Sequence, residues 1–306
     1  WQDEMPEWAK TGESIPGLEI SKSEIESKTT LSPRKGPAIF GFSRASQRIA
    51  TEPSLPDPAS MTYSSTPLGN RVARLYLNPI SGRMIHDGMQ KAMKIMIGTD
   101  NVHQLSPMSL LHLVACTPDF LALWPRKEEV ERIHSAIHSH QREFLAEAVD
   151  ADIERRMKGV LVLEDWINEA KMEELENNWN VQPGDVRSRV DLAEWLLYAM
   201  REILNDDDEL RKLDPSQHKI LVDLVSELHR RISHGCKSDL LGLVSIRGIG
   251  RSRAREMVDL LGVENASDVA ALTERDRDKL ASLRGWSSRL VDNLVDAASR
   301  KTRRQL

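Results

Sequence analysis

The sequence predicts a mainly α-helical protein: a multi-helix bundle followed by a small helical hairpin domain, after a mostly irregular N-terminal segment. Apolar side chains recur at alternating steps of three and four along most of residues 81–236, as on the buried face of a helix. The same range is almost free of the alternating β-branched and aromatic runs that are typical of strands. A Gly-x-Gly turn at Gly248 and Gly250 indicates a tight connection between two helices in the final segment.

Residues 1–61 are expected to be mostly irregular, because residues 1–60 hold 7 of the 14 prolines and show little periodicity. One stretch in this segment, PAIFGFSRASQRIA (37–50), predicts a short strand that runs into the start of a helix. Residues 62–76 then predict an extended segment, a Pro-Leu-Gly turn and a short helix that carries Val72, Leu75 and Tyr76.

Between residues 81 and 234 the periodicity predicts a succession of helices separated by clear breaks. Pro107 stands near a helix start, Pro125 interrupts the pattern, and Asp185 is a good N-cap. The predicted helices are 82–97, 106–116, 127–140, 142–149, 153–157, 160–169, 171–178, 186–205 and 215–233.

The composition is that of a globular cytoplasmic protein, with 40 % hydrophobic and 29 % charged residues. No apolar run is long enough for a membrane span, and no N-terminal stretch has the order of a signal peptide. Cys116 and Cys236 lie far apart without a CxxC partner, which indicates reduced thiols rather than a disulfide framework or a zinc site. The net charge is −5, yet residues 237–306 contain 14 Lys/Arg against 10 Asp/Glu. This basic end weakly indicates an anionic partner.

Trp195 occupies an unexpected position on its predicted helix. Val190, Ala193, Leu197 and Met200 form one apolar stripe, and at about 100° per residue Trp195 lies roughly 140–200° away from it. The face around Trp195 carries polar, charged and aromatic residues, namely Ser188, Asp191, Tyr198 and Glu202, with Arg187 at its edge. Taken from these residues alone, Trp195 either covers a neighbouring helix or offers a platform on which a nucleobase stacks.

The stretch IRGIGRSRA (246–254) has the pattern of a helix-hairpin-helix motif. Gly248 and Gly250 permit a tight turn and a close approach of phosphate, and the next helix begins with amides that favour an anion. Three arginines stand at that helix start, namely Arg251, Arg253 and Arg255. Positive charge at a helix N-terminus interacts unfavourably with the helix dipole, and nearby phosphates would offset that cost. These features favour nucleic-acid contact over a plain turn with solvated arginines, and residues 280–298 resemble a degenerate second copy of the hairpin.

Other local patterns do not predict an active site. GVLVLEDW (159–166) imitates a Walker B strand, but no GxxxxGK[ST] loop accompanies it, so we interpret it as a helix of the core. His134 and His138 are one helical turn apart and His140 follows, yet a third ligand is not evident, so no metal is expected. No local motif suggests a catalytic triad or dyad.

Five stretches, taken together and in this order, resemble the C-terminal half of the archaeal HelQ-like DNA repair helicases, which belong to the Ski-two-like group of superfamily II. They are TPLGNRVARLYLNPISG (66–82), SPMSLLHLVACTPDFLALWPRKEE (106–129), VLVLEDWINEA (160–170), NVQPGDVRSRVDLAEWLLYAM (180–200) and IRGIGRSRAREM (246–257). The resemblance implies that 62–80 is the end of a winged-helix domain, 81–236 a helical ratchet bundle and 237–306 a helix-hairpin-helix domain.

The resemblance also implies roles for individual residues. Trp195 falls where the ratchet helix of such helicases stacks an aromatic ring on translocating single-stranded DNA, which favours the DNA-facing alternative. In the family an arginine seven residues before this aromatic also contacts the DNA. That position is Ser188 here, between Arg187 and Arg189, so either arginine could take this role. Gly248, Gly250 and the three hairpin arginines are implied to grip the emerging strand.

The chain departs from that family because both RecA-like motor domains and most of the winged helix are missing from the sequence. No cofactor is therefore expected in this chain, since ATP and Mg²⁺ would bind the motor domains, and the chain alone should not hydrolyse ATP. The expected function is the single-stranded DNA-binding region of a 3′-to-5′ ATP-dependent repair helicase, with single-stranded or forked DNA as partner. The alternative is a non-catalytic interaction module that docks a motor domain or a repair protein through the Met-rich helix 84–97.

Overall fold

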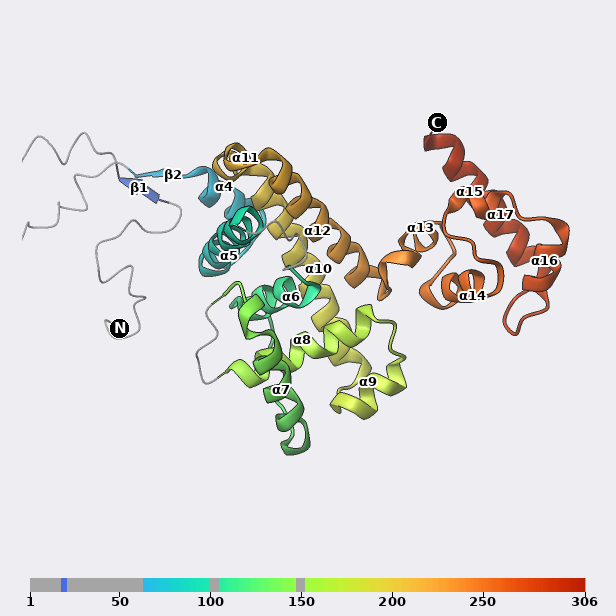
Figure 1. The fold of residues 1–306 in the computed structure, drawn as a ribbon, viewed down its shortest axis with the longest axis horizontal. Coiled ribbons are helices and arrows are strands. Elements are labelled where there is room, and N and C mark those ends of the chain that lie inside the picture. Colours follow the sequence, from blue (N-terminus) through green and yellow to red (C-terminus); the bar gives the residue numbers. More distant parts are fainter. Residues whose placement is uncertain (1–17, 21–62, 99–104, 147–151, 306) are drawn as a thin grey trace, which may run out of the picture. The chain divides into compact units, whose positions relative to one another are not determined.

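A computed structural model describes residues 18–20, 63–98, 105–146 and 152–305 (Figure 1). The chain divides into two compact units, Trp1–Pro79 and Ile80–Leu306. The strand and helix start that the sequence predicts within 37–50 lie outside the described residues, as does most of the segment 1–61.

The described residues of the first unit, 18–20 and 63–79, form two short strands and a helix. Strand β1 (Leu18–Ile20) pairs antiparallel with β2 (Tyr63–Ser65). Helix α4 (Pro67–Arg74) begins where the Thr66 side chain accepts a hydrogen bond from the Gly69 amide at 3.0 Å. The expected extended segment and short helix are present. The prediction was wrong for Tyr76, which follows the end of α4 with φ +57° and is 89 % exposed.

The second unit begins with a bundle of α-helices and short 3₁₀ turns (Figure 1). Its elements are α5 (Pro79–Gly98), α6 (Pro107–Cys116), η4 (Lys127–Glu129), α7 (Val130–His140), η5 (Gln141–Glu143), α8 (Ile153–Ile167), α9 (Met172–Trp179), α10 (Pro183–Asp206), α11 (Asp208–Leu213) and α12 (Pro215–His234). Helices α10 and α12 pack along each other, and α6 packs against α8.

Most of the predicted helices are confirmed, and the departures have tertiary causes. The segments 153–157 and 160–169 join into the single helix α8. The helix continues through Gly159, which packs so closely on the Phe120 ring that an added Cβ would lie only 2.8 Å from it. The predicted helix 142–149 is wrong over 142–146, where a 3₁₀ turn ends and Phe144 is extended, with its ring stacked on His112 at 3.7 Å. Residues 147–149 lie outside the described part.

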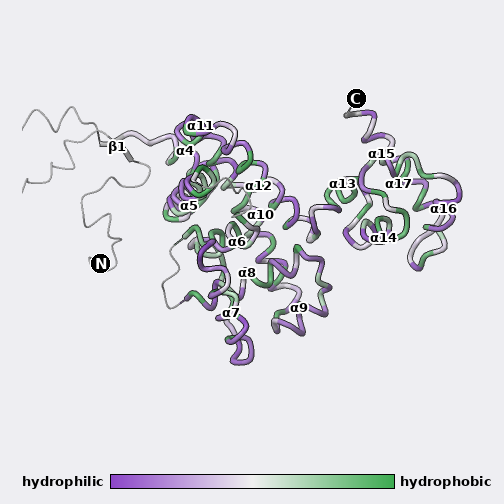
Figure 2. The backbone as a smooth tube through the Cα atoms, in the orientation of Figure 1, coloured by the Kyte–Doolittle hydropathy of each residue, from purple (hydrophilic) through white to green (hydrophobic). Residues whose placement is uncertain are grey.

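A smaller helical region follows α12, with its own hydrophobic core. Its elements are η6 (Ser238–Leu240), α13 (Leu241–Val244), α14 (Arg251–Leu261), α15 (Ala266–Ala270), α16 (Glu274–Ala281) and α17 (Ser288–Gln305). Figure 2 shows hydrophobic and hydrophilic residues alternating along the helices of both regions, as amphipathic helices around a core require. Among the described residues, no helix is long and apolar enough to cross a membrane.

The terminal region contains two copies of one helical turn. Gly248 and Gly285, 37 residues apart, both have positive φ, +95° and +85°. The amide of the residue after each glycine donates to a carbonyl three residues earlier at 3.1 Å: Ile249 to Ile246, and Trp286 to Leu283. The resemblance between 245–257 and 280–298 in the sequence therefore corresponds to two turns of the same geometry.

Candidate nucleic-acid interface

Helix α10 presents Trp195 on the side that is not buried in the bundle. The prediction of Asp185 as the N-cap is wrong, because α10 begins at Pro183 and Gln182 is its N-cap. Asp185 is the third helical residue, and its carboxylate accepts a hydrogen bond from the Gln182 amide at 3.1 Å. The predicted stripe is confirmed, since its members Val190, Ala193, Leu197, Met200 and Leu204 are all buried. Trp195 itself is half-buried, whereas Asp191 and Tyr198, one turn to either side of it, are exposed.

The residues that the sequence places around Trp195 differ in their accessibility. Arg187 is exposed and forms an ion pair with Asp191 at 2.8 Å, one turn along the same helix. Both side chains are more than half exposed, so the pair contributes little and Arg187 can readily exchange Asp191 for another anion.

Arg189 makes contacts within the protein instead. Its guanidinium donates to the carbonyl oxygen of Leu121 at 3.1 Å and to the Ser188 hydroxyl at 2.9 Å, and it lies 3.4 Å from the Asp185 carboxylate. Desolvation by burial lowers the pKa of Arg189, against the opposing effect of Asp185. Arg189 and Ser188 therefore hold the loop after α6 against α10, and Arg187 is the accessible arginine beside Trp195.

The two glycines of the turn before α14 differ in the space beside them. Gly250 is the N-cap residue of α14, and a Cβ built on it would meet nothing within 4 Å. A Cβ on Gly248, with φ +95°, would be strained and would lie 3.1 Å from Leu294. Gly250, at the start of α14, is thus exposed and has open space beside it, as the close approach of a phosphate requires.

Arg251, the first residue of α14, is engaged within the protein. Its guanidinium donates to the carbonyl oxygens of Gly235 at 2.9 Å and Ala170 at 3.0 Å, and it stacks over the Trp166 ring at 4.1 Å. Burial lowers its pKa, while Glu169 and Cys236 oppose that change. Arg251 therefore joins the terminal region to the end of α8.

Arg255, one turn later, reinforces the same junction. It binds the Glu169 carboxylate through two hydrogen bonds of 2.9 and 2.7 Å, and the Asp239 carboxylate at 2.8 and 3.1 Å. The hydrogen bonds that Arg255 donates to the two carboxylates, Glu169 first, raise its pKa. Its positive charge is already compensated inside the protein.

Arg253 differs from its two neighbours. Its guanidinium has a single contact of 3.3 Å to the carbonyl oxygen of Gly248 and lies 6.0 Å from the Trp286 ring. Of the three hairpin arginines, Arg253 is thus the one that, in the described structure, neither pairs with a carboxylate nor donates to the segment that follows α8. Sequence reasoning missed Arg247 and Arg284, which are exposed immediately before Gly248 and Gly285. The signal for them was their equal position in the two copies of the turn.

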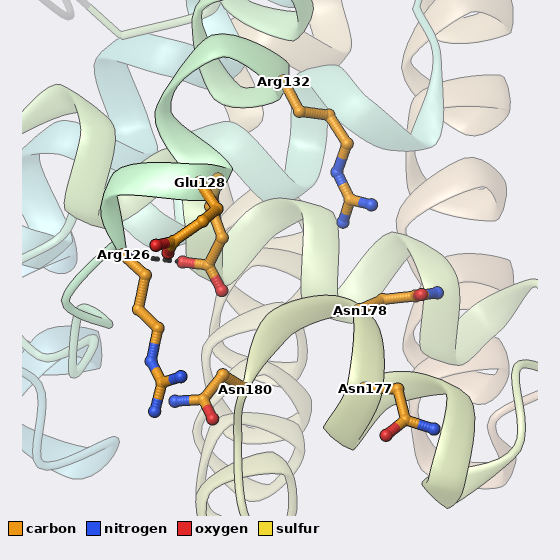
Figure 3. Close-up of a pocket in the computed structure, with 7 residues that line it drawn as sticks. Arg126, Glu128, Arg132, Asn177, Asn178 and Asn180 are labelled. Carbon is orange, nitrogen blue, oxygen red and sulfur yellow. Dashed lines mark hydrogen bonds between the residues drawn. The ribbon is translucent and has the colours of Figure 1, made fainter.

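A separate polar cavity of about 300 Å³ lies between the start of α7 and the end of α9 (Figure 3). Neither Trp195 nor the hairpin arginines line it. It is lined by Arg126, Glu128, Glu129, Arg132, Asn177, Asn178 and Asn180. Arg132 stacks on the Trp179 ring at 3.3 Å, and Glu129 pairs with Lys158 at 2.8 Å, so much of the lining supports the fold.

The remaining sequence candidates lie in ordinary structural positions. GVLVLEDW forms part of α8, with Val160 to Leu163 buried, so the helical interpretation is confirmed. His134 contacts Glu154 at 2.6 Å and His140 contacts Glu143 at 3.2 Å. Within the described ranges, no group of three His, Cys, Asp or Glu side chains is arranged to hold a metal ion.

Comparison with known proteins agrees with this architecture. Residues 108–235, which run from α6 to the end of α12, match the family model of archaeal helicase domain 4. The chain is 28 % identical over 246 residues to an ATP-dependent DNA helicase Hel308 of Pyrococcus horikoshii, which covers 78 % of this chain and 31 % of the relative. Hel308 helicases of Pyrococcus abyssi and Methanocella arvoryzae are also 28 % identical, over 74 % and 78 % of this chain and 29 % and 31 % of their own lengths. The chain is therefore similar to archaeal Hel308-type helicases, and it spans less than a third of the length of these relatives.

Proposed function

We propose that this chain is the single-stranded DNA-binding, C-terminal region of a 3′-to-5′ ATP-dependent DNA repair helicase. In this proposal residues 62–80 end a winged-helix domain, 81–236 form the ratchet bundle and 237–306 form the helix-hairpin-helix domain. ATP and Mg²⁺ would be bound by motor domains supplied outside the present sequence. Unwinding would act on single-stranded or forked DNA in the cytoplasm.

The observation that carries the proposal is the setting of Trp195 on α10. A large aromatic ring lies half-buried between exposed Asp191 and exposed Tyr198, on a helix whose opposite stripe is fully buried. A rigid helix thus carries an aromatic side chain and, about two turns earlier, the accessible cation Arg187, and an aromatic ring with a cation on one helix is the combination that serves stacking and phosphate contact with single-stranded nucleic acids. The open turn at Gly250 and the unpaired charge of Arg253 supply a second contact in the terminal region.

The alternative, docking of a partner through the Met-rich helix, has less support. Met89, Met93 and Met96 of α5 are at most 2 % exposed, so they form part of the core of the bundle and are not available as a docking face.

A titration with fluorescently labelled oligo(dT) tests the proposal. Trp195→Ala should weaken binding about tenfold, because stacking on an aromatic contributes about 1–3 kcal/mol per base. Arg253→Gln should weaken binding and reduce the slope of log affinity against log salt by about 0.7, as expected for one lost phosphate contact. Substituting Arg251 or Arg255 is less informative, because both hold the terminal region to α8.

Two matched variants serve as controls. Trp124→Ala removes an aromatic ring that is 73 % exposed, outside the proposed interface. Arg83→Gln removes an exposed arginine of α5. Both should bind as the wild type does. Absence of salt-sensitive binding by the wild type, or equal binding by Trp195→Ala and wild type, would contradict the proposal and favour the interaction module.

A further inference from the structure

A group of cationic side chains lies beyond Trp195, where α10 runs beside α12. Tyr198, one turn after Trp195, is 39 % exposed, and its ring lies 6.4 Å from the ring of His229 on α12. The guanidinium of Arg201 lies over the Tyr198 ring, 5.0 Å from the ring centroid. Arg230 follows His229 on α12 and is exposed. An aromatic side chain is thus surrounded by positively charged or protonatable groups from two helices.

Nearby positive charges contribute to lowering the pKa values of His229 and His234. Burial is the main cause that lowers the pKa of His229, and Glu194 opposes it, but Arg201, Arg230 and His234 lower it further. His234 shows the same balance, with burial lowering its pKa, Glu194 raising it and Arg230 lowering it. Positively charged groups that lie near one another repel. A bound anion would reduce this repulsion, so such a surface favours anion binding.

The group extends to the terminal region through Lys301 of α17. The Lys301 ammonium donates a hydrogen bond to the Ser245 hydroxyl, just before the Gly248 turn. Burial lowers the pKa of Lys301, and the positive charge of Arg230 lowers it further. Positive charge therefore continues from α10 across α12 to the hairpin region.

The carboxylates nearby compensate only part of this charge. Glu202 pairs with Arg201 at 3.1 Å, and Glu194 is the remaining acidic side chain that acts on the two histidines. In the described part of the chain, the structure gives neither Arg230 nor Lys301 an ion pair with a carboxylate.

We propose that Tyr198, Arg230 and Lys301 form a second contact for single-stranded DNA, which continues the Trp195 face toward the terminal hairpin. A base next to the one on Trp195 would stack on Tyr198, and its phosphates would lie against Arg230 and Lys301. This inference rests on the proposed function, since it adds a second nucleotide site to the same strand. It also gives the strand a continuous cationic path between the two contacts that Trp195 and Arg253 provide.

The test uses the same labelled oligo(dT), about 12 nucleotides long, with the full chain. Tyr198→Ala should weaken binding about fivefold or more, whereas Tyr198→Phe should bind as the wild type does, because the ring and not the hydroxyl makes the contact. Arg230→Gln and Lys301→Gln should each reduce the salt slope by about 0.7. Lys219→Gln, an exposed lysine about three turns before Arg230 on α12, is the matched control and should leave both affinity and slope unchanged.

The outcomes separate this inference from the proposed function. Loss of binding in Trp195→Ala together with wild-type binding by Tyr198→Ala and Arg230→Gln would overturn the second contact and leave the first intact. Failure of the wild type to bind oligo(dT) would overturn both. Equal losses in Tyr198→Ala and Tyr198→Phe would also overturn it, because stacking would then not be the cause. Circular dichroism and urea unfolding of each variant confirm that the exposed substitutions leave the fold unchanged.

Discussion

Arg255 and Glu169 form two parallel hydrogen bonds, of 2.9 and 2.7 Å, between the terminal helix α14 and the turn that follows α8. Glu169 adopts φ +72°, a left-handed conformation that costs a residue with a side chain about 1 kcal/mol or more. The same carboxylate accepts a hydrogen bond from the Lys237 amide at 3.1 Å. The strained backbone thus places one carboxylate where it binds both the terminal helix and the segment that leads to it.

Breaking this pair should loosen the terminal region. Arg255→Gln should lower the free energy of unfolding by about 1–2 kcal/mol, because the bidentate pair is only partly exposed, 29 % for Arg255 and 16 % for Glu169. A double-mutant cycle with Glu169→Gln, followed by urea unfolding, should give a favourable coupling energy. Glu169→Gly provides the control for backbone strain and should cost less than Glu169→Gln. Additive effects of Arg255→Gln and Glu169→Gln would contradict the role of the pair.

Gly235 is required by the contact between α8 and α14. Its φ is +62°, and an added Cβ would lie 2.4 Å from the Trp166 ring and 2.7 Å from the Arg251 guanidinium. Gly235→Ala should therefore destabilise the protein by about 2–4 kcal/mol, through strain and overpacking together.

Gly262 offers a matched control for that substitution. It ends α14 with a similar φ of +66°, but a Cβ there would meet nothing within 4 Å. Gly262→Ala should cost only about 1 kcal/mol, the conformational strain alone. Thermal unfolding of both variants measures the difference. Equal destabilisation by Gly235→Ala and Gly262→Ala would mean that close packing of Trp166 and Arg251 on Gly235 does not contribute to the cost.

Lys158 and Glu129 form a buried ion pair of 2.8 Å, with side chains 3 % and 8 % exposed. Lys158 also donates to the Trp124 carbonyl oxygen at 3.0 Å. Lys158→Met should destabilise the fold by about 3–5 kcal/mol, because it leaves the Glu129 carboxylate buried without its cation. Urea unfolding should show that Lys158→Met with Glu129→Gln recovers part of this loss. If the single and double variants are equally stable, the buried charge is not the cause.

His112 should make stability depend on pH. Burial, and after it the charges of Arg156 and Lys91, lowers its pKa from 6.5 to about 4. Between these values the unfolded chain binds a proton that the folded chain does not, so stability falls as pH decreases from about 6.5 to 4, by up to about 3 kcal/mol. His112→Leu should reduce the difference between unfolding free energies at pH 7 and pH 5. An unchanged difference would assign the pH dependence to other groups.

The sequence predicted the helical architecture because periodic burial is a local property of the chain. The stripe from Val190 to Leu204, the hydrogen bond between the Asp185 carboxylate and the Gln182 amide and the glycine turn at Gly248 all depend on residues within a few positions of one another. That residues 142–146 do not continue as a helix could not be predicted in the same way, because the stacking of Phe144 on His112 acts across 32 positions of sequence.

The sequence by itself determined that Trp195 stands opposite the buried stripe of its helix, and that arginines gather at the start of α14. Only the tertiary structure decided which arginines remain available. Arg187 and Arg253 keep accessible guanidinium groups, whereas Arg189, Arg251 and Arg255 are taken by carbonyl and carboxylate oxygens of distant segments. The physical reason is that an arginine's charge and spacing are properties of the chain, but the acceptors that satisfy its donors are brought to it by folding.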